Sequence, residues 1–148
     1  MFFDYYVSRD PALACEAGSR IEGIGRPRVE ASFLPDVVDA MVKVPDRWSI
    51  AAMLELSARL GRRVGGSTGT NLVAALVAAQ RMRGAGERGS IVTVLCDGGE
   101  RYGETYFDER WLAANDLRCD DERRWIAQWI DGGQTPAQAQ SALALAGF

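Results

Sequence analysis

Apolar residues recur at helical spacing in two stretches of the chain. The first stretch predicts a helix with Asp46 as its N-cap and Gly61 as its terminator. Its apolar positions follow an i, i+3, i+4, i+8 pattern, at Ile50, Met53, Leu54 and Ala58. A second helix is predicted over about residues 70–82, where leucines and valines are interspersed with alanines small enough to pack closely against a sheet. Both helices are expected to face a core.

Three segments have the composition of strands. These are the aromatic run Phe2 to Val7, the short segment Met41 to Val44, and Ser90 to Cys96. The last, "SIVTVLC", is almost continuously apolar, which is typical of a strand buried on both faces of a parallel sheet. The order of strands and helices predicts an α/β layered fold with a mostly parallel sheet. Because open sheets usually have about four to six strands, three strands look like part of a larger sheet.

The remaining segments are predicted as one long loop and a set of short helices. Glycines and prolines between Gly18 and Pro35 predict a long loop, of a kind that is often functional. A short helix is expected near residues 108–115. The segment "DDERRWIAQWIDGG" predicts an amphipathic helix, and a last helix is predicted through "AQAQSALALAG", residues 137–147, with Pro136 at its first position. The apolar face of the amphipathic helix consists of Trp125, Ile126, Trp129 and Ile130.

Composition narrows the function classes. The 148 residues fit one domain, with 47% hydrophobic and 25% charged residues, as in ordinary globular proteins. A net charge of −3 argues against a nucleic-acid partner, and no apolar run is long enough for a membrane span, so a cytoplasmic protein is expected. Three widely spaced cysteines and no histidine argue against a disulfide framework, a metal site and a Ser/His/Asp arrangement. Any reactive group is therefore expected to come from outside the side chains of this sequence.

The run "VGGSTGTN" at residues 64–71 has three glycines and three hydroxyl side chains just before an apolar helix. Free backbone N–H groups and the helix dipole favour an anion at such a position. A plain turn and helix cap is the alternative, because neither of the common glycine-rich phosphate motifs is present.

Four motifs occur in register and carry a family resemblance: "RIEGIG", "FLPDVVDAMVKVPD", "RLGRRVGGSTGTNLVAAL" and "IVTVLCDGGERY". Together they resemble the C-terminal half of the pyridoxal-phosphate enzymes of the cysteine synthase and cystathionine β-synthase family, most of all its L-cysteine desulfhydrase-like branch. The resemblance covers Arg20 to Tyr102, and more weakly extends to Asp116. It implies the C-terminal part of a three-layer, fold-type II domain over residues 1–116, followed by a helical tail over residues 117–148.

The resemblance also implies site residues. The Ser67 hydroxyl would lie against the pyridine nitrogen of pyridoxal phosphate, where a weak partner suits β-elimination and β-replacement. The cofactor-binding residues would be Gly66, Ser67, Thr68, Cys96 and Asp97, with Glu100, Arg101 and Tyr102 as support. The substrate-binding residues, at the mouth of the site, would be Gly23, Ile24 and Gly25. The sequence departs from the family pattern at Cys96 and Gly98, and through the insertion "RPRVEAS" after Gly25.

The Schiff-base lysine of the family lies upstream of every matching motif. Lys43, the only lysine, aligns with a structural strand. The predicted function is therefore that of a fragment of an enzyme that either releases sulfide from cysteine or forms cysteine from an activated serine. The fragment is expected to be inactive alone, and only the complete enzyme would act on an amino acid.

Two alternatives remain open. One is a non-catalytic domain that pairs with itself, as a homo-oligomer, or with a full-length homologue. Its motivation is the apolar surface of Trp125 and Trp129, whose simpler interpretation is packing within the chain. The other is weak binding of phosphate at Ser67.

Overall fold

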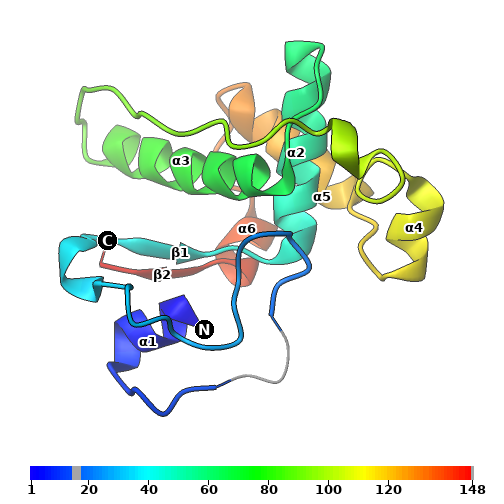
Figure 1. Ribbon diagram of the computed structural model, residues 1–148. Coiled ribbons are helices and arrows are strands. Elements are labelled where there is room, and N and C mark those ends of the chain that lie inside the picture. Colours follow the sequence, from blue (N-terminus) through cyan, green and yellow to red (C-terminus); the bar gives the residue numbers. More distant parts are fainter. Residues whose placement is uncertain (15–17, 148) are drawn as a thin grey trace.

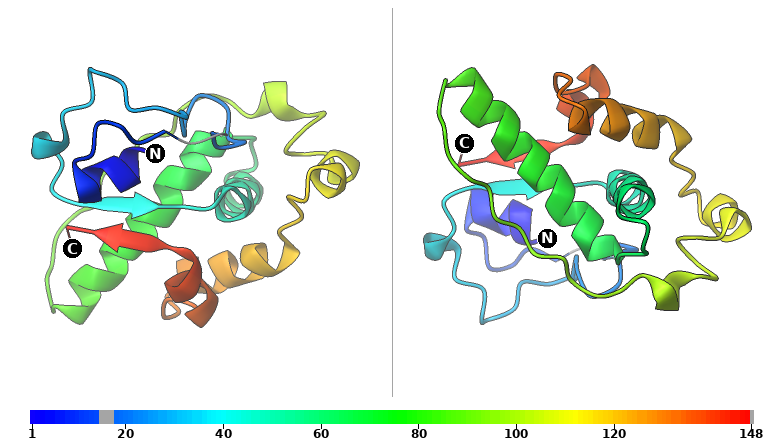
Figure 2. Two further views of the ribbon diagram at one scale, coloured as in Figure 1. Left: turned by 90° about the horizontal axis from the view of Figure 1, so that it is seen from below. Right: turned by 90° about the horizontal axis from the view of Figure 1, so that it is seen from above.

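The computed structural model describes residues 1–14 and 18–147, and Figures 1 and 2 show their arrangement. The helices are α1 (Phe2–Ser8), α2 (Asp46–Leu60), α3 (Gly66–Gly84), α4 (Glu109–Ala114), α5 (Asp120–Ile130) and α6 (Ala137–Ala142). The strands are β1 (Met41–Lys43) and β2 (Ala144–Ala146), and two 3-10 turns are η1 (Pro35–Val37) and η2 (Glu100–Tyr102).

The centre of the core is the crossing of α2 and α3 (Figure 1). Ile50 and Met53 of α2 are fully buried there. Gly69 lets the two backbones approach closely, since a Cβ at this position would lie 2.0 Å from the carbonyl oxygen of Ser49. The two apolar helix faces therefore meet at Gly69, where the absence of a side chain allows close contact.

The C-terminal end predicted for α2 is correct, and the predicted N-terminal end is wrong by one residue. Gly61 follows the helix with a φ of 64°, so the predicted terminator is confirmed. Pro45 occupies the N-cap position and Asp46 is the first helical residue. The Asp46 carboxylate instead accepts hydrogen bonds from the Ser19 hydroxyl (2.6 Å) and the Arg20 N–H (2.5 Å). It thereby fixes the start of the 18–35 loop, which contains no helix or regular strand up to Pro35, as predicted.

The sheet differs from the predicted one. β1 confirms the short strand predicted at residues 41–44, but its partner is β2 from the far end of the chain, antiparallel, with Met41 opposite Ala146. Residues 144–146 were predicted as part of the last helix, which ends at Ala142. The described residues thus form a mixed α/β structure with a two-stranded antiparallel sheet, and they do not form the expected three-layer, mostly parallel sheet.

The aromatic segment at the N-terminus is helix α1, so the strand predicted for Phe2 to Val7 is wrong. The physical reason is the i, i+3 spacing of Phe2 and Tyr5, which puts both rings on the same side of a helix. Both contact Phe33, with ring centroids 4.9 and 6.1 Å apart. The Tyr6 hydroxyl donates to the carbonyl oxygens of residues 38 and 39 and so ties α1 to the segment before β1.

The segment Ser90–Cys96 forms no strand, contrary to prediction. It returns along α3 as an extended chain (Figures 1 and 2) and is exposed along its whole length, with Val92 92% accessible. A strand that is apolar on both faces needs cover on both, and the described residues do not provide it.

The predicted amphipathic helix is confirmed as α5, which packs against α2. Ile126 and Trp129 are buried, and the Trp125 ring stacks on Trp48 with centroids 5.8 Å apart. Arg59 of α2 also pairs with Asp131 at 2.7 Å, although exposed ion pairs of this kind contribute little. The two tryptophans that suggested an interface therefore pack within the chain.

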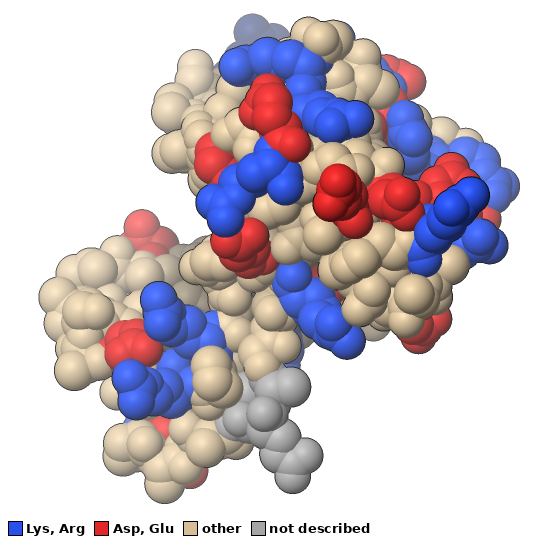
Figure 3. Space-filling model, turned by 45° about the vertical axis from the view of Figure 1, so that its right-hand side comes forward, with Lys and Arg blue, Asp and Glu red and all other residues tan. Residues whose placement is uncertain are grey.

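The surface carries charges of both signs. On the face shown in Figure 3, acidic and basic side chains are interspersed. Among residues 1–14 and 18–147, no helix combines the length and the apolar character that crossing a bilayer requires.

Candidate functional site

The glycine-rich run and the segment after residue 95 meet in space. The Gly65 N–H donates to the Asp97 carbonyl at 3.0 Å, and the Cys96 N–H donates to the Thr68 hydroxyl at 3.0 Å. Val64 and Gly98 form an isolated antiparallel bridge. The structure therefore brings together the two groups of residues expected to bind the cofactor: Gly66, Ser67 and Thr68 with Cys96 and Asp97.

Asp97 is held by an internal hydrogen bond. Its carboxylate accepts from the Tyr102 hydroxyl at 2.6 Å. Burial, and then this hydrogen bond, raise the pKa of Tyr102 above its ordinary value. A Cβ at Gly65 would lie 2.0 Å from the Asp97 carboxylate, so this close approach requires a glycine. Tyr102 thus fixes the side chain of Asp97, one of the residues expected to bind the cofactor.

The loop that contains Gly23, Ile24 and Gly25 lies beside the start of α3. Gly23 and Gly25 have φ values of 84° and 67°, which favour glycine. Ile21, just before them, is 2% exposed and packs against Gly66, where a Cβ would come within 3.0 Å of its side chain. The predicted substrate-binding loop and the predicted cofactor-binding residues are therefore neighbours.

Tyr106 holds this arrangement together, and sequence reasoning missed it. Its hydroxyl donates to the Arg20 carbonyl at 2.8 Å and accepts from the Glu22 N–H at 2.9 Å. Its ring stacks on Tyr102, with centroids 4.8 Å apart, and burial raises its pKa. The only signal in the sequence was an aromatic pair, Tyr106 and Phe107, within a segment otherwise read as an irregular loop.

Ser67 stands at the N-terminus of the 19-residue helix α3 and is half-buried. Within the described residues, nothing accepts a hydrogen bond from the N–H groups of Gly66 and Ser67, and nothing bonds to the Ser67 hydroxyl. A hydroxyl and two backbone donors at a helix N-terminus can serve a ring nitrogen or an anion. These residues therefore fit a non-covalent contact with a ring or a phosphate.

Lys43 lies apart from these donors. Its ammonium contacts both carboxylate oxygens of Asp4, at 2.9 and 3.1 Å. This hydrogen bond lowers the pKa of Asp4. Lys43 lines a cavity of about 470 Å³ together with Gly25 and Arg26, and Ser67 does not line it. The only amine side chain therefore lies near the predicted substrate loop, where it forms an ion pair with Asp4.

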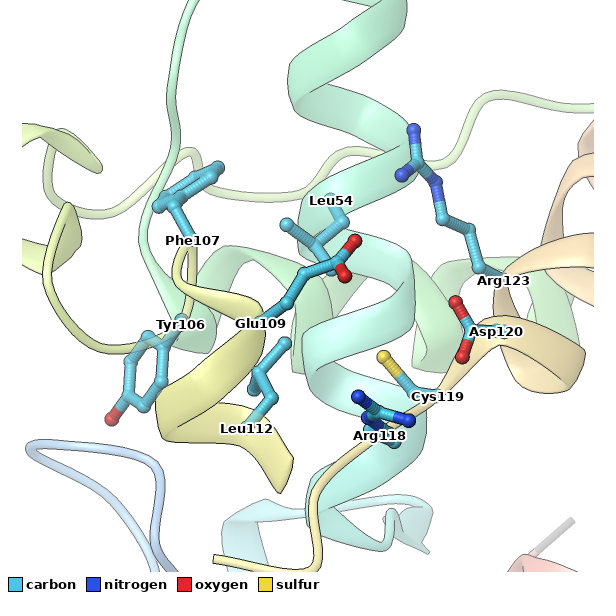
Figure 4. A pocket seen from close by; sticks show the side chains of 9 residues that line it. All are labelled: Leu54, Tyr106, Phe107, Glu109, Leu112, Arg118, Cys119, Asp120 and Arg123. Carbon is cyan, nitrogen blue, oxygen red and sulfur yellow. The ribbon is translucent and has the colours of Figure 1, made fainter. Parts of the chain in front are cut away.

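A second cavity, of about 250 Å³, lies among α2, α4 and α5 (Figure 4). None of the predicted site residues lines it, and sequence reasoning did not find it. Leu54, Phe107 and Leu112 form its apolar part, and charged side chains lie around Cys119 (Figure 4). Cys119 is buried, and burial followed by nearby carboxylates raises the pKa of its thiol to about 12.

The two described cysteines are therefore expected to differ in reactivity. At pH 8, an aromatic disulfide reagent should modify exposed Cys96 at least about tenfold faster than Cys119, because the thiolate is the reactive form. Stability should also fall as the pH rises from 9 toward 12, since the unfolded thiol ionises first and the folded one resists ionisation. Peptide mass spectrometry gives the rates, and Cys119→Ala should reduce the alkaline loss. Equal labelling of the two thiols in the folded protein would contradict the assignment.

No family model matches the chain, but individual relatives do. It is 54% identical over 116 residues to the L-cysteine desulfhydrase Cds1 of Mycobacterium tuberculosis, a match that covers 78% of this chain and 32% of that protein. It is 32% identical over 116 residues to cysteine synthase 1 of Emericella nidulans, covering 76% and 30%. It is 40% identical over 96 residues to a putative cysteine synthase of Sinorhizobium fredii, covering 64% and 27%.

The chain thus spans about a third or less of the length of these relatives. Residues of three of the motifs, "RIEGIG", "RLGRRVGGSTGTNLVAAL" and "IVTVLCDGGERY", meet around the start of α3. The chain belongs to the cysteine synthase family and corresponds to the C-terminal part of its members.

Proposed function

We propose that this chain forms the wall of a pyridoxal-phosphate site that faces the cofactor ring, in an enzyme that carries out β-elimination from cysteine or β-replacement on an activated serine. The observation that carries the proposal is the convergence of the Ser67 loop with residues 96 and 97, through the hydrogen bonds from Cys96 to Thr68 and from Gly65 to Asp97. The similarity to an L-cysteine desulfhydrase supports the same chemistry.

The residues have distinct roles in this proposal. Ser67, whose hydroxyl has no partner within the described residues, donates to the ring nitrogen. Gly66 contributes its free backbone N–H, since its Cα is packed against Ile21 and Tyr106, while Thr68 positions the backbone of Cys96. Asp97, fixed by Tyr102, holds the Gly65 turn in place. When bound, pyridoxal phosphate withdraws electrons from the α-carbon of an amino acid, which labilises substituents at the β-carbon.

The substrate would enter over the loop of Gly23, Ile24 and Gly25. Positive φ values at both glycines turn the backbone sharply without a side chain in the way. Tyr106 ties the preceding residues to the wall, and the Gly25 carbonyl accepts from the Ser19 N–H at 2.9 Å, so the loop is anchored at both ends. This arrangement would hold the backbone of residues 23–25 in place beside an amino acid.

The covalent anchor of the cofactor is proposed to come from other polypeptide. Residues 1–116 would form the partial pyridoxal-phosphate domain and residues 117–148 a helical tail. Lys43 is paired with Asp4, and Ser67 does not line the cavity beside it. The 148 residues alone should therefore bind the cofactor weakly at most and should not release sulfide from cysteine.

Titration with pyridoxal phosphate tests the proposal. We expect pyridoxal phosphate to quench tryptophan fluorescence saturably. Ser67→Ala should raise the Kd about tenfold, as for a lost hydrogen bond to a charged or strongly polar group. Borohydride should trap no adduct on Lys43, and Lys43→Ala should bind as the parent does. Equal binding by the parent chain and Ser67→Ala would contradict the role of Ser67. A borohydride adduct on Lys43 would contradict the missing anchor.

A second candidate function is phosphate binding without the ring. The unpaired N–H groups of Gly66 and Ser67 at the start of α3 favour it. Inorganic phosphate that competes with pyridoxal phosphate at equal concentration would indicate that the site selects the anion, whereas the absence of competition would favour recognition of the ring.

A further inference from the structure

The cavity among α2, α4 and α5 has an apolar floor (Figure 4). Leu54, Phe107 and Leu112 form this floor, and the Cys119 thiol lies beside them. Leu112 and Cys119 are only 5% and 4% exposed, and α5 packs against α2 on one side of the cavity. The cavity is therefore bounded by core residues of this chain.

The rim of the cavity carries charges of both signs. Glu109 extends from α4 toward the start of α5, where Arg118 and Asp120 lie (Figure 4). Among residues 1–14 and 18–147, none of these three side chains has an ion-pair partner, whereas Arg123 of the same rim pairs with Glu55 at 3.3 Å. One guanidinium and two carboxylates are therefore free to bind a ligand that carries the opposite charges.

The size of the cavity and its charges together indicate a class of ligand. Pockets for drug-sized molecules begin at about 300 Å³, and this cavity of about 250 Å³ admits a smaller molecule. A carboxylate on the ligand would pair with Arg118, whose planar fork matches carboxylate geometry. An ammonium would pair with Glu109 or Asp120, and an aliphatic chain would cover the apolar floor. A free α-amino acid with an aliphatic side chain carries all three groups.

Tyr106 connects this cavity to the loop of residues 18–35. Its ring lines the cavity, and its hydroxyl points away from it (Figure 4). That hydroxyl donates to the Arg20 carbonyl and accepts from the Glu22 N–H. A ligand that packs on the ring would therefore restrict the residue that holds the start of the loop.

We propose that this cavity is an effector site for a free α-amino acid with an aliphatic side chain. The bound amino acid restricts the ring of Tyr106 and so slows the opening of the 18–35 loop at Glu22. The inference goes beyond the proposed cofactor site and does not depend on it, because none of the residues proposed to bind the cofactor lines the cavity.

Calorimetric titration of the full chain with L-leucine tests the site. We expect a Kd of about 0.1 to 1 mM, as for a small ligand. Glycine, 3-methylbutylamine and 4-methylpentanoate lack the side chain, the carboxylate and the ammonium, respectively. Each should bind at least about tenfold more weakly than leucine.

Arg118→Gln should raise the Kd for leucine about tenfold, because it removes the charge that pairs with the carboxylate. Arg110→Gln removes the same charge from an exposed position on α4 outside the cavity and should leave the Kd unchanged. Ser67→Ala should also leave it unchanged, which separates this site from the cofactor wall.

Hydrogen exchange of the Glu22 N–H, followed by NMR, tests the effector role. Saturating leucine should slow this exchange at least about threefold, because the N–H donates to the Tyr106 hydroxyl. Tyr106→Phe keeps the ring that lines the cavity and removes the hydroxyl. This variant should bind leucine with the parent's Kd, while exchange at Glu22 no longer responds to leucine.

Three results would overturn the site: no binding of leucine by the full chain, equal binding of leucine and 4-methylpentanoate, or an unchanged Kd in Arg118→Gln. Displacement of leucine by pyridoxal phosphate would place the amino acid beside Ser67 and would also overturn it. Leucine binding that leaves the exchange of the Glu22 N–H unchanged would overturn the effector role.

Discussion

Gly69→Ala is expected to lower the free energy of unfolding by about 3 kcal/mol, although alanine is the better helix former. The added Cβ would lie 2.0 Å from the Ser49 carbonyl oxygen and 2.7 Å from the Met53 nitrogen. Both are backbone atoms, so no side-chain rotation relieves the contact. α2 and α3 must move apart, and the packing of the fully buried residues beside the crossing is lost. Urea unfolding followed by circular dichroism measures the change.

Gly84→Ala is the matched control, because it makes the same substitution at the end of the same helix. Nothing lies within 4 Å of a Cβ there. Helix propensity alone should therefore act, with a gain of up to about 1 kcal/mol. If both variants are stabilised equally, the close contact between α2 and α3 is wrong.

Ile126→Ala is expected to cost about 3 kcal/mol and to lower the stability of the whole chain in a single transition. Ile126 is 0% exposed and belongs to α5, which packs against α2. Removal of its side chain leaves a cavity between two helices that cannot close without separating Trp125 from Trp48. Thermal unfolding followed at 222 nm and by tryptophan fluorescence measures both the size of the effect and the number of transitions.

Gln128→Ala provides the control on the exposed side of the same helix and should change stability by less than about 0.5 kcal/mol. Non-coincident transitions for the two probes in Ile126→Ala would show that residues 117–148 unfold apart from the rest. A coincident transition would show instead that this tail is part of one cooperative unit with α2.

Helices with a clear apolar stripe could be predicted from the sequence, because their partners lie within the described chain. α2 buries Ile50 and Met53 of its predicted stripe but leaves Ala58 exposed. α5 buries Ile126 and Trp129, and Gly61 ends α2 as expected. The start of α3 was placed four residues late because glycines at positions 66 and 69 are poor helix formers. Their value appears only in the packed structure, where Gly69 faces the α2 backbone.

The strands could not be predicted, since strand formation depends on neighbours that local sequence does not specify. Residues 91–95 have the right composition but pair with no strand among the described residues. Residues 2–7 are rich in aromatic side chains, and as a helix they pack against Phe33. β2 contains alanines and a leucine, which favour helix locally, and it becomes a strand by pairing with β1.

The candidate site was predicted as a set of residues but not as a geometry. The family resemblance pointed to residues 66–68, 96 and 97, and these converge. Tyr106 could not be found in the same way, because its role depends on two backbone groups far away in sequence, at Arg20 and Glu22. Hydroxyl groups that bridge loops leave no periodic signal.

The pairing of β1 with β2 has a consequence for folding on the ribosome. The two strands come from distant parts of the sequence, with Met41 opposite Ala146. β1 therefore emerges from the exit tunnel long before its partner, while α2 and α3 can already pack. Contacts between such distant segments close slowly. Nascent chains stalled before residue 144 should accordingly be cut by protease near residues 41–43, and release of the last few residues should protect that site.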